Sequence, residues 1–114
     1  MTGVIDVLHK MRELLGTPGG WCKRYYALDK NKTCVRATSP DACQFCLEGS
    51  IWAASTRLNE NVPSTSDIFV KTKAFLQFLL PDMSLIYFND LPERTLEDVL
   101  RFLDEAILQA ETRL

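Results

Sequence analysis

Apolar residues recur every three or four positions over residues 3–15, which predicts an amphipathic helix at this point of the chain. Gly16 follows as a helix stop, and Pro18 lies just beyond it. The same spacing over residues 67–80 and 95–113 predicts two further helices. Their predicted inward faces contain Val4, Val7, Leu8, Met11, Leu14 and Leu15 in the first helix, Ile68, Phe69, Thr72, Phe75, Leu76 and Leu79 in the next, and Leu96, Val99, Leu100, Leu103, Ile107, Ala110 and Leu114 in the last.

A fourth helix is predicted over residues 40–58. Ser39 suits its N-cap, Pro40 its first helical position and Asp41 its first turn. Because apolar residues fall on two sides of this helix, we expect it to lie centrally in the fold. Gly49 is small enough for a neighbouring backbone to approach closely.

The segments between the helices favour extended and turn structure. Residues 21–37 place aromatic residues around a polar turn, so a small β-hairpin or an ordered loop is predicted there. The short apolar run at residues 85–88 is expected to be extended, and residues 89–92 resemble a turn. A polar connector is predicted at residues 59–66, and the Thr95-Leu96-Glu97-Asp98 sequence resembles a capping box.

These elements predict a mainly α fold, a compact four-helix domain over residues 1–114 with a small β-hairpin or ordered loop between the first two helices. A chain of 114 residues that is 46% hydrophobic and 25% charged has the composition of a globular protein. A formal net charge of −2 argues against general attraction to nucleic acids or anionic membranes. We expect no membrane span and no targeting segment, hence a cytoplasmic protein with reduced cysteines.

Charge is nevertheless unevenly distributed along the chain. Residues 21–36 contain five basic residues and one acidic residue, a net charge of +4. Residues 89–114 contain three basic and seven acidic residues, a net charge of −4. The two segments either face each other or are solvated; alternatively, the basic segment meets an acidic or phosphate-bearing partner.

The cysteines allow a second kind of hypothesis. Cys43 and Cys46 form a C-x-x-C pair. In thioredoxin-like redox proteins this motif lies at the N-terminus of a helix within a βαβ unit, but no βαβ pattern surrounds the pair in this chain. Buried structural thiols are therefore the favoured interpretation. A zinc site would draw on Cys22, Cys34, Cys43 and Cys46, and reversible disulfide chemistry is a further alternative. His9 is the single histidine and is expected to face solvent, so no cofactor or metal is predicted.

Two clusters are candidates for ligand binding. The Trp21-Cys22-Lys23-Arg24-Tyr25-Tyr26 segment interleaves aromatic and basic residues, a mixture that suits nucleotides, protein surfaces or plain structural packing. Asn89 and Asp90 belong to a polar loop whose role is either structural or functional. If a site exists, we predict it between residues 21–36 and 88–94, with Trp21, Arg24, Tyr25, Asn89 and Asp90 as its binding residues.

Several motifs between residues 21 and 107 are shared with a known group of proteins. They are Trp21 with Ala27-Leu28-Asp29, Asp41-Ala42-x-x-Phe45-Cys46-Leu47-x-Gly49-Ser50, Phe88-Asn89-Asp90, and Thr95-x-x-x-Val99-Leu100-x-x-Leu103-Asp104-x-Ala106-Ile107. With these motifs the chain resembles an uncharacterised family of small bacterial and phage-associated proteins. The aromatic-Asn-Asp step before a capped helix is the most specific of them. The resemblance implies the layout of elements and carries no activity.

The leading functional hypothesis is a small non-enzymatic module that binds another protein, associated with a phage or mobile element. The first alternative is a binder of a small molecule or nucleotide, or an enzyme acting on one, with its pocket between residues 21–36 and 88–94. The second alternative is a thiol-redox or zinc module. The last helix could also pair with a copy of itself.

Overall fold

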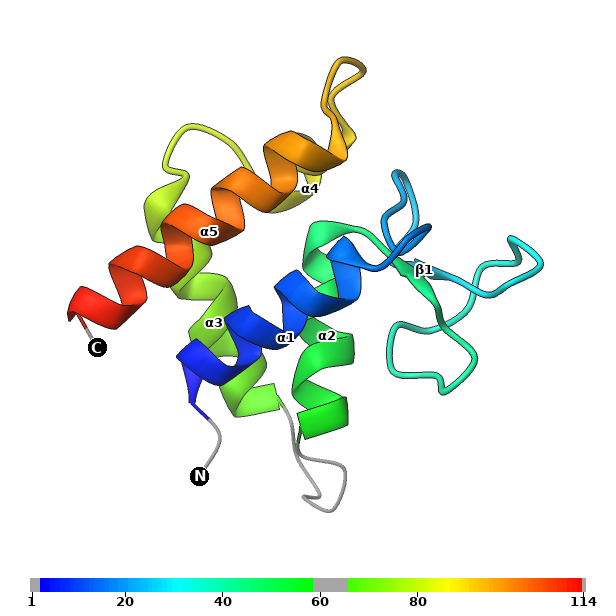
Figure 1. The fold of residues 1–114 in the computed structure, drawn as a ribbon, viewed down its shortest axis with the longest axis horizontal. Coiled ribbons are helices and arrows are strands. Elements are labelled where there is room, and N and C mark those ends of the chain that lie inside the picture. Colours follow the sequence, from blue (N-terminus) through cyan, green and yellow to red (C-terminus); the bar gives the residue numbers. More distant parts are fainter. Residues whose placement is uncertain (1–2, 59–65, 114) are drawn as a thin grey trace.

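The computed structural model describes residues 3–58 and 66–113 (Figure 1). Within these residues the chain forms five helices and one two-stranded antiparallel sheet. The mainly α class is therefore confirmed, although the number of helices is five and not four. The predicted connector at 59–66 and the predicted inward residue Leu114 fall largely or wholly outside the described residues. The elements are α1 (Val4–Gly16), β1 (Ala27–Leu28), β2 (Gln44–Phe45), α2 (Leu47–Leu58), α3 (Ser66–Leu79), α4 (Leu85–Asp90) and α5 (Leu96–Arg113).

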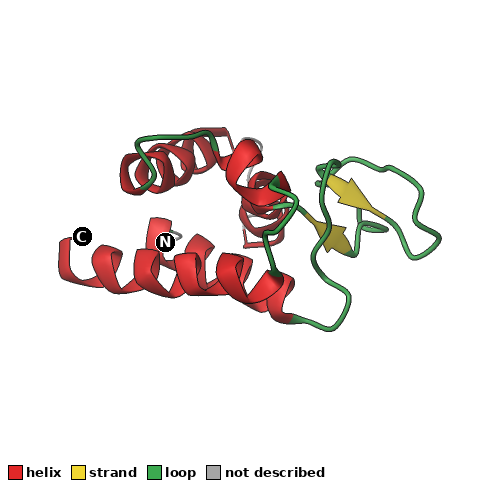
Figure 2. Cartoon of the chain, turned by 90° about the horizontal axis from the view of Figure 1, so that it is seen from above, coloured by secondary structure: helices red, strands yellow, loops and turns green. Residues whose placement is uncertain are grey.

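The helical core is built around α1, which contacts α2 on one side and α5 on another, while α3 contacts α2 (Figures 1 and 2). The apolar stripes of α1, α3 and α5 face this core as their spacing predicts. No described helix combines the length and apolar character needed to cross a membrane. The fully buried core side chains include Val7, Leu8, Met11, Leu15, Leu47, Ile51, Leu76, Leu85, Val99 and Leu103.

The start of α5 confirms the predicted capping box. The Thr95 backbone N–H donates to the Asp98 carboxylate at 3.0 Å, and the Asp98 N–H donates to the Thr95 hydroxyl at 3.2 Å. The hydrogen bond from the Thr95 backbone is the main reason that the pKa of Asp98 lies below its usual value. A shorter acidic side chain thus replaces the usual glutamate of this motif.

The prediction of a helix over residues 40–58 is wrong for its first part, because α2 begins at Leu47. Ser39 does not cap a helix; its hydroxyl accepts a hydrogen bond from the Asp41 N–H in a turn. The following backbone bonds to distant segments: the Phe45 N–H donates to Gly20 O at 2.9 Å, and the Cys46 N–H donates to Tyr26 O at 3.3 Å. These long-range bonds replace the intrahelical ones that local signals favour.

Residues 21–37 form an ordered lobe that extends from the helical core (Figure 2). The strand pairing differs from the predicted hairpin, because β1 pairs with β2 in the register Ala27↔Phe45 and Leu28↔Gln44. The predicted return arm contributes a single bridge between Leu28 and Cys34. The lobe is therefore anchored to the sequence that leads into α2.

Residues 85–88 were predicted to be extended, and this is wrong: they belong to the short helix α4. The Ser84 hydroxyl caps this helix by accepting the Tyr87 N–H at 3.0 Å. Its inward face consists of Leu85, Phe88 and Asn89. Six residues are too few to show a helical period, so the cap is the only local signal.

The predicted close approach at Gly49 is confirmed. A β-carbon at Gly49 would overlap the carbonyl oxygen of Tyr26 and lie 2.8 Å from its carbonyl carbon. The absence of a side chain on α2 therefore lets the backbone just before β1 rest directly on the helix.

Candidate functional site

A buried asparagine joins three segments that are distant in sequence. Asn89 is fully buried, and its side-chain oxygen accepts hydrogen bonds from the Trp21 indole N–H at 2.7 Å and the Leu47 backbone N–H at 3.0 Å. Its side-chain nitrogen donates to Cys22 O at 3.1 Å and to the Asp90 carboxylate at 2.9 Å. We call Asn89, Trp21, Cys22, Leu47 and Asp90 the Asn89 cluster. It ties the lobe and the start of α2 to the end of α4.

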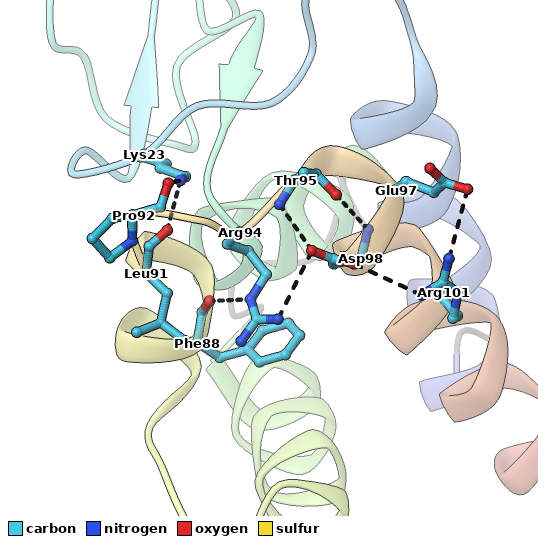
Figure 3. A network of polar contacts seen from close by, with 9 residues as sticks. All are labelled: Lys23, Phe88, Leu91, Pro92, Arg94, Thr95, Glu97, Asp98 and Arg101. Atoms are coloured by element: carbon cyan, nitrogen blue, oxygen red, sulfur yellow. Dashed lines mark hydrogen bonds and ion pairs between the residues drawn. The ribbon is translucent and has the colours of Figure 1, made fainter.

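A second set of contacts closes the C-terminal end of α4 (Figure 3). The Lys23 ammonium donates to Leu91 O at 2.6 Å and to Pro92 O at 3.2 Å. The Arg94 guanidinium donates to Phe88 O at 2.8 Å and lies 3.9 Å from the centre of the Phe88 ring. Positive groups at the C-terminal end of a helix satisfy its last carbonyls. Lys23 and Arg94 therefore have structural partners.

Arg24 stands next to this junction with an unusual backbone. Its φ angle is 76°, in the left-handed region that disfavours side chains other than glycine. Its N–H donates to the Asp90 carboxylate at 3.0 Å, which helps to hold this conformation. Strained residues of this kind are frequent at functional sites.

Arg24 and Asp90 line a shallow hollow of about 110 Å³ between the lobe and α4. It lies where the sequence predicts a pocket, between residues 21–36 and 88–94. Of the predicted residues, Arg24, Tyr25 and Asp90 line it, whereas Trp21 and Asn89 belong to the hydrogen-bonded support and do not. The lining residues are Arg24, Tyr25, Tyr26, Cys46, Ile86 and Asp90.

Three of these lining residues were not among the predicted binding residues. Tyr26 lies in the aromatic and basic run, so its sequence signal was present. Ile86 has no such signal, because residues 85–88 are predicted to be extended whereas they belong to α4. Cys46 was missed because the helix was expected to start before it, which would have turned it onto an apolar stripe.

Glu48, which is itself paired with Lys73, influences the Tyr26 phenol. Glu48 is buried and its carboxylate lies 3.1 Å from the Lys73 ammonium. The negative charge of Glu48 is the main reason that the pKa of the Tyr26 phenol is raised, with a hydrogen bond to Glu48 adding to the effect. A second hollow, of about 270 Å³, lies beside Tyr26 and is lined by Arg36, Ala37, Thr38 and Trp52 as well. Trp52 is itself stacked on Phe69, with ring centres 3.7 Å apart.

The four cysteines are free thiols in two different environments. Cys34 and Cys43 are exposed, whereas Cys46 is buried and Cys22 is half-buried. Burial raises the pKa of Cys46 to about 11 and that of Cys22 to about 12. The Cys46 sulfur accepts the Gly49 N–H at 3.2 Å, so it caps α2. Among residues 3–58 and 66–113, no three histidine, cysteine or acidic side chains are grouped for metal binding.

These environments predict a clear order of alkylation. In folded protein at about pH 8, iodoacetamide should modify Cys34 and Cys43 at least about tenfold faster than Cys22 and Cys46, because the thiolate is the reacting form. All four should react in denaturant. Pulse labelling followed by peptide mass spectrometry measures these rates. Rapid labelling of Cys46 alongside Cys43 would contradict the structural role of Cys46 and favour thiol chemistry at the C-x-x-C pair.

The oppositely charged segments do not face each other through ion pairs. Among the described residues, every ion pair formed by residues 94–104 joins them to one another or to Arg12, and none reaches the lobe. The contacts between residues 21–24 and 89–92 are hydrogen bonds that involve the side chains of Trp21, Lys23, Asn89 and Asp90 together with backbone groups. The exposed basic residues of the lobe are therefore not neutralised by the acidic residues of the 94–104 segment.

Comparison with known proteins gives one decisive result. The family model DUF6197, described as a family of unknown function, matches residues 1–109. The chain belongs to the DUF6197 family. No curated protein and no solved structure matches it. The resemblance to an uncharacterised family is thus confirmed, and the function of this DUF6197 protein has to be argued from its geometry.

Arg24 of the DUF6197 protein, with its left-handed backbone conformation, allows a test of backbone strain. Arg24→Gly should raise the free energy of unfolding by about 0.5–1 kcal/mol, because glycine adopts this φ without steric cost. Tyr25→Gly, next to it but without a positive φ, should lower it. Urea unfolding measures both values. A loss of stability in Arg24→Gly equal to that in Tyr25→Gly would show that the arginine is retained for packing.

Proposed function

We propose that this protein is a non-enzymatic module that binds another protein through the surface formed by Arg24, Tyr25, Tyr26 and Ile86. The observation that carries the proposal is the exposure of three large apolar side chains around one arginine. Tyr25 is 50% exposed, Tyr26 48% and Ile86 41%. Tyrosine and arginine are, with tryptophan, the residues enriched among those that dominate binding energy at protein interfaces.

The size of the hollow between these residues supports the same proposal. Its volume of about 110 Å³ is well below the roughly 300–1,000 Å³ of pockets that enclose small molecules. A hollow of this size suits one inserted side chain of a partner. The alternative of a small-molecule or nucleotide site stays a prediction, and at this particular hollow it would require the hollow to widen on binding.

The finer expectations from the sequence belong to the proposal as well. We propose a cytoplasmic location and an association with a phage or mobile element, the latter carried by the resemblance alone. Cell fractionation tests the first, and the genes that neighbour those of DUF6197 members test the second.

Site-specific photo-crosslinking tests the binding surface directly. A photoreactive phenylalanine analogue at Tyr25 should give a discrete covalent adduct in the cells that produce the protein, and mass spectrometry identifies the attached protein. The matched control carries the same analogue at Phe78, an aromatic residue on α3 that is 62% exposed. We expect no adduct of the same mass at Phe78.

A partner captured through Tyr25 should also depend on the surface as a whole. Tyr25→Ala combined with Ile86→Ala should abolish co-purification of that partner without changing the helical circular dichroism. An identical pattern of adducts at Tyr25 and Phe78, or full co-purification with the double variant, would refute the proposed function.

A further inference from the structure

Tyr26 lies between two hollows, each of which is lined by one arginine. The hollow on one side contains Arg24, and the hollow on the other contains Arg36. A third, more open depression continues past Arg36 to Ser39 and also borders Tyr26. The three hollows share Tyr26, so they form one interrupted surface over the lobe. We call it the Tyr26 surface.

The basic residues of this surface have no acidic partner in the described part of the chain. None of the ion pairs in that part of the chain involves Arg24 or Arg36. Residues 21–41 contain five basic and two acidic residues, a net charge of +3. This stretch of the chain is therefore locally basic, although the whole chain has a net charge of −2.

The acids closest to the surface already have partners. The Asp29 carboxylate accepts the backbone N–H groups of Asn31 and Thr33. The Asp90 carboxylate accepts the Arg24 N–H at 3.0 Å, and the buried Glu48 pairs with Lys73. Because these carboxylates already accept hydrogen bonds or form an ion pair within this chain, they are poor binding groups for a cation of a partner.

The backbone of the central aromatic residue is fixed in place by contacts within the chain. The Tyr26 carbonyl rests against Gly49 of α2 and accepts the Cys46 N–H. A tyrosine side chain has only two χ angles, so it loses little conformational entropy when it is covered. Tyr26 therefore has the properties of a preformed anchor.

From this arrangement we infer that the partner contacts the Tyr26 surface with an acidic segment of polypeptide. The segment lies across Tyr26 and places carboxylates against Arg24 and Arg36. The inference rests on the proposed function and adds the chemistry of the partner. A nucleic acid fits less well, because its affinity depends on neutralising many phosphates with a broadly basic surface.

Selection from a library of short random peptides displayed on phage tests the inference. Peptides retained by the wild-type protein should be enriched in aspartate and glutamate. For a synthetic copy of the best peptide, Arg24→Glu combined with Arg36→Glu should weaken binding about tenfold or more, as measured by fluorescence anisotropy. The wild-type affinity should also fall as salt is raised. The matched control, Lys71→Glu combined with Arg101→Glu, reverses two exposed cations on α3 and α5 and should bind as the wild type does.

The variants separate failure of the inference from failure of the proposed function. Peptides without acidic enrichment whose binding is lost in Tyr25→Ala with Ile86→Ala would overturn the inference and leave the proposed function standing. If selection yields no peptide that depends on Tyr25 and Ile86, both fail. Binding of a fluorescent single-stranded oligonucleotide that requires Arg24 and Arg36 would also overturn the inference. So would self-association of the wild-type protein in light scattering that is abolished by Arg24→Glu combined with Arg36→Glu.

Discussion

Asn89→Ala is expected to lower the free energy of unfolding by about 4 kcal/mol, because it leaves buried polar groups without partners. The Leu47 N–H at the start of α2, the indole N–H of Trp21 and the carbonyl of Cys22 each lose a hydrogen bond to this one side chain. The buried Leu47 N–H costs about 1–3 kcal/mol when it is left without a partner, the two partly buried groups cost less each, and the removed volume adds a small cavity. Urea unfolding followed by circular dichroism measures the loss.

Asn31→Ala provides the control for this variant, since it removes the same side chain from an exposed turn. It should change stability by less than about 0.5 kcal/mol. Tryptophan fluorescence, to which Trp21 and Trp52 both contribute, offers a second readout, because the Trp21 indole N–H loses its acceptor in Asn89→Ala and not in Asn31→Ala. A loss below about 1 kcal/mol in Asn89→Ala would mean that the Asn89 cluster contributes little to the fold.

Gly49→Ala is expected to destabilise the protein by about 2–3 kcal/mol, the upper range for overpacking. Local propensity predicts the opposite sign, since alanine is better than glycine inside a helix by about 1 kcal/mol. The clash decides the outcome, because the new methyl group meets backbone atoms of Tyr26 that no rotamer change can move. Thermal unfolding should show a lower Tm, and Tyr26 should be displaced with the backbone.

Gly16→Ala is the matched control for Gly49→Ala. A β-carbon at Gly16 would meet only the end of the Arg12 side chain, at 3.1 Å, and that side chain can rotate away. Gly16→Ala should therefore be neutral or stabilising by up to about 1 kcal/mol. Equal effects at both glycines would show that the close approach between Tyr26 and α2 is unimportant.

The three helices with sustained periodicity were predictable because their packing follows one apolar stripe. Residues 3–15, 67–80 and 95–113 differ from α1, α3 and α5 by no more than a residue at each end. In these segments local preference and burial favour the same structure. The cap of α5 could be found as well, since Thr95 and Asp98 are only three residues apart.

Residues 39–46 could not be predicted, because their structure depends on partners far along the chain. Their Ser-Pro-Asp sequence favours a helix start locally. In the fold, Phe45 and Cys46 bond to Gly20 and Tyr26, and those bonds are invisible to short-range patterns. The six residues of α4 were missed for a different reason, namely that they are fewer than two helical turns.

The candidate site was predictable in its location and less so in its residues. The aromatic and basic run and the Asn-Asp step do lie side by side, as predicted. Sequence cannot separate Asn89, which is fully buried, from Asp90, which lines the hollow, because their roles depend on which way a single helical turn faces. Sequence likewise cannot tell that Trp21 belongs to the hydrogen-bonded support while Tyr25 lines the hollow.

The pairing of α1 with α5 has a consequence for how the protein is made. The Arg12 guanidinium meets the Asp104 carboxylate at 2.8 Å, across a separation of 92 residues. A ribosome therefore releases α1 long before the helix that covers one of its sides exists. Until residues 96–113 emerge, part of the apolar face of α1 remains exposed and accessible to chaperones. Cooperative folding can be completed only after α5 has been translated.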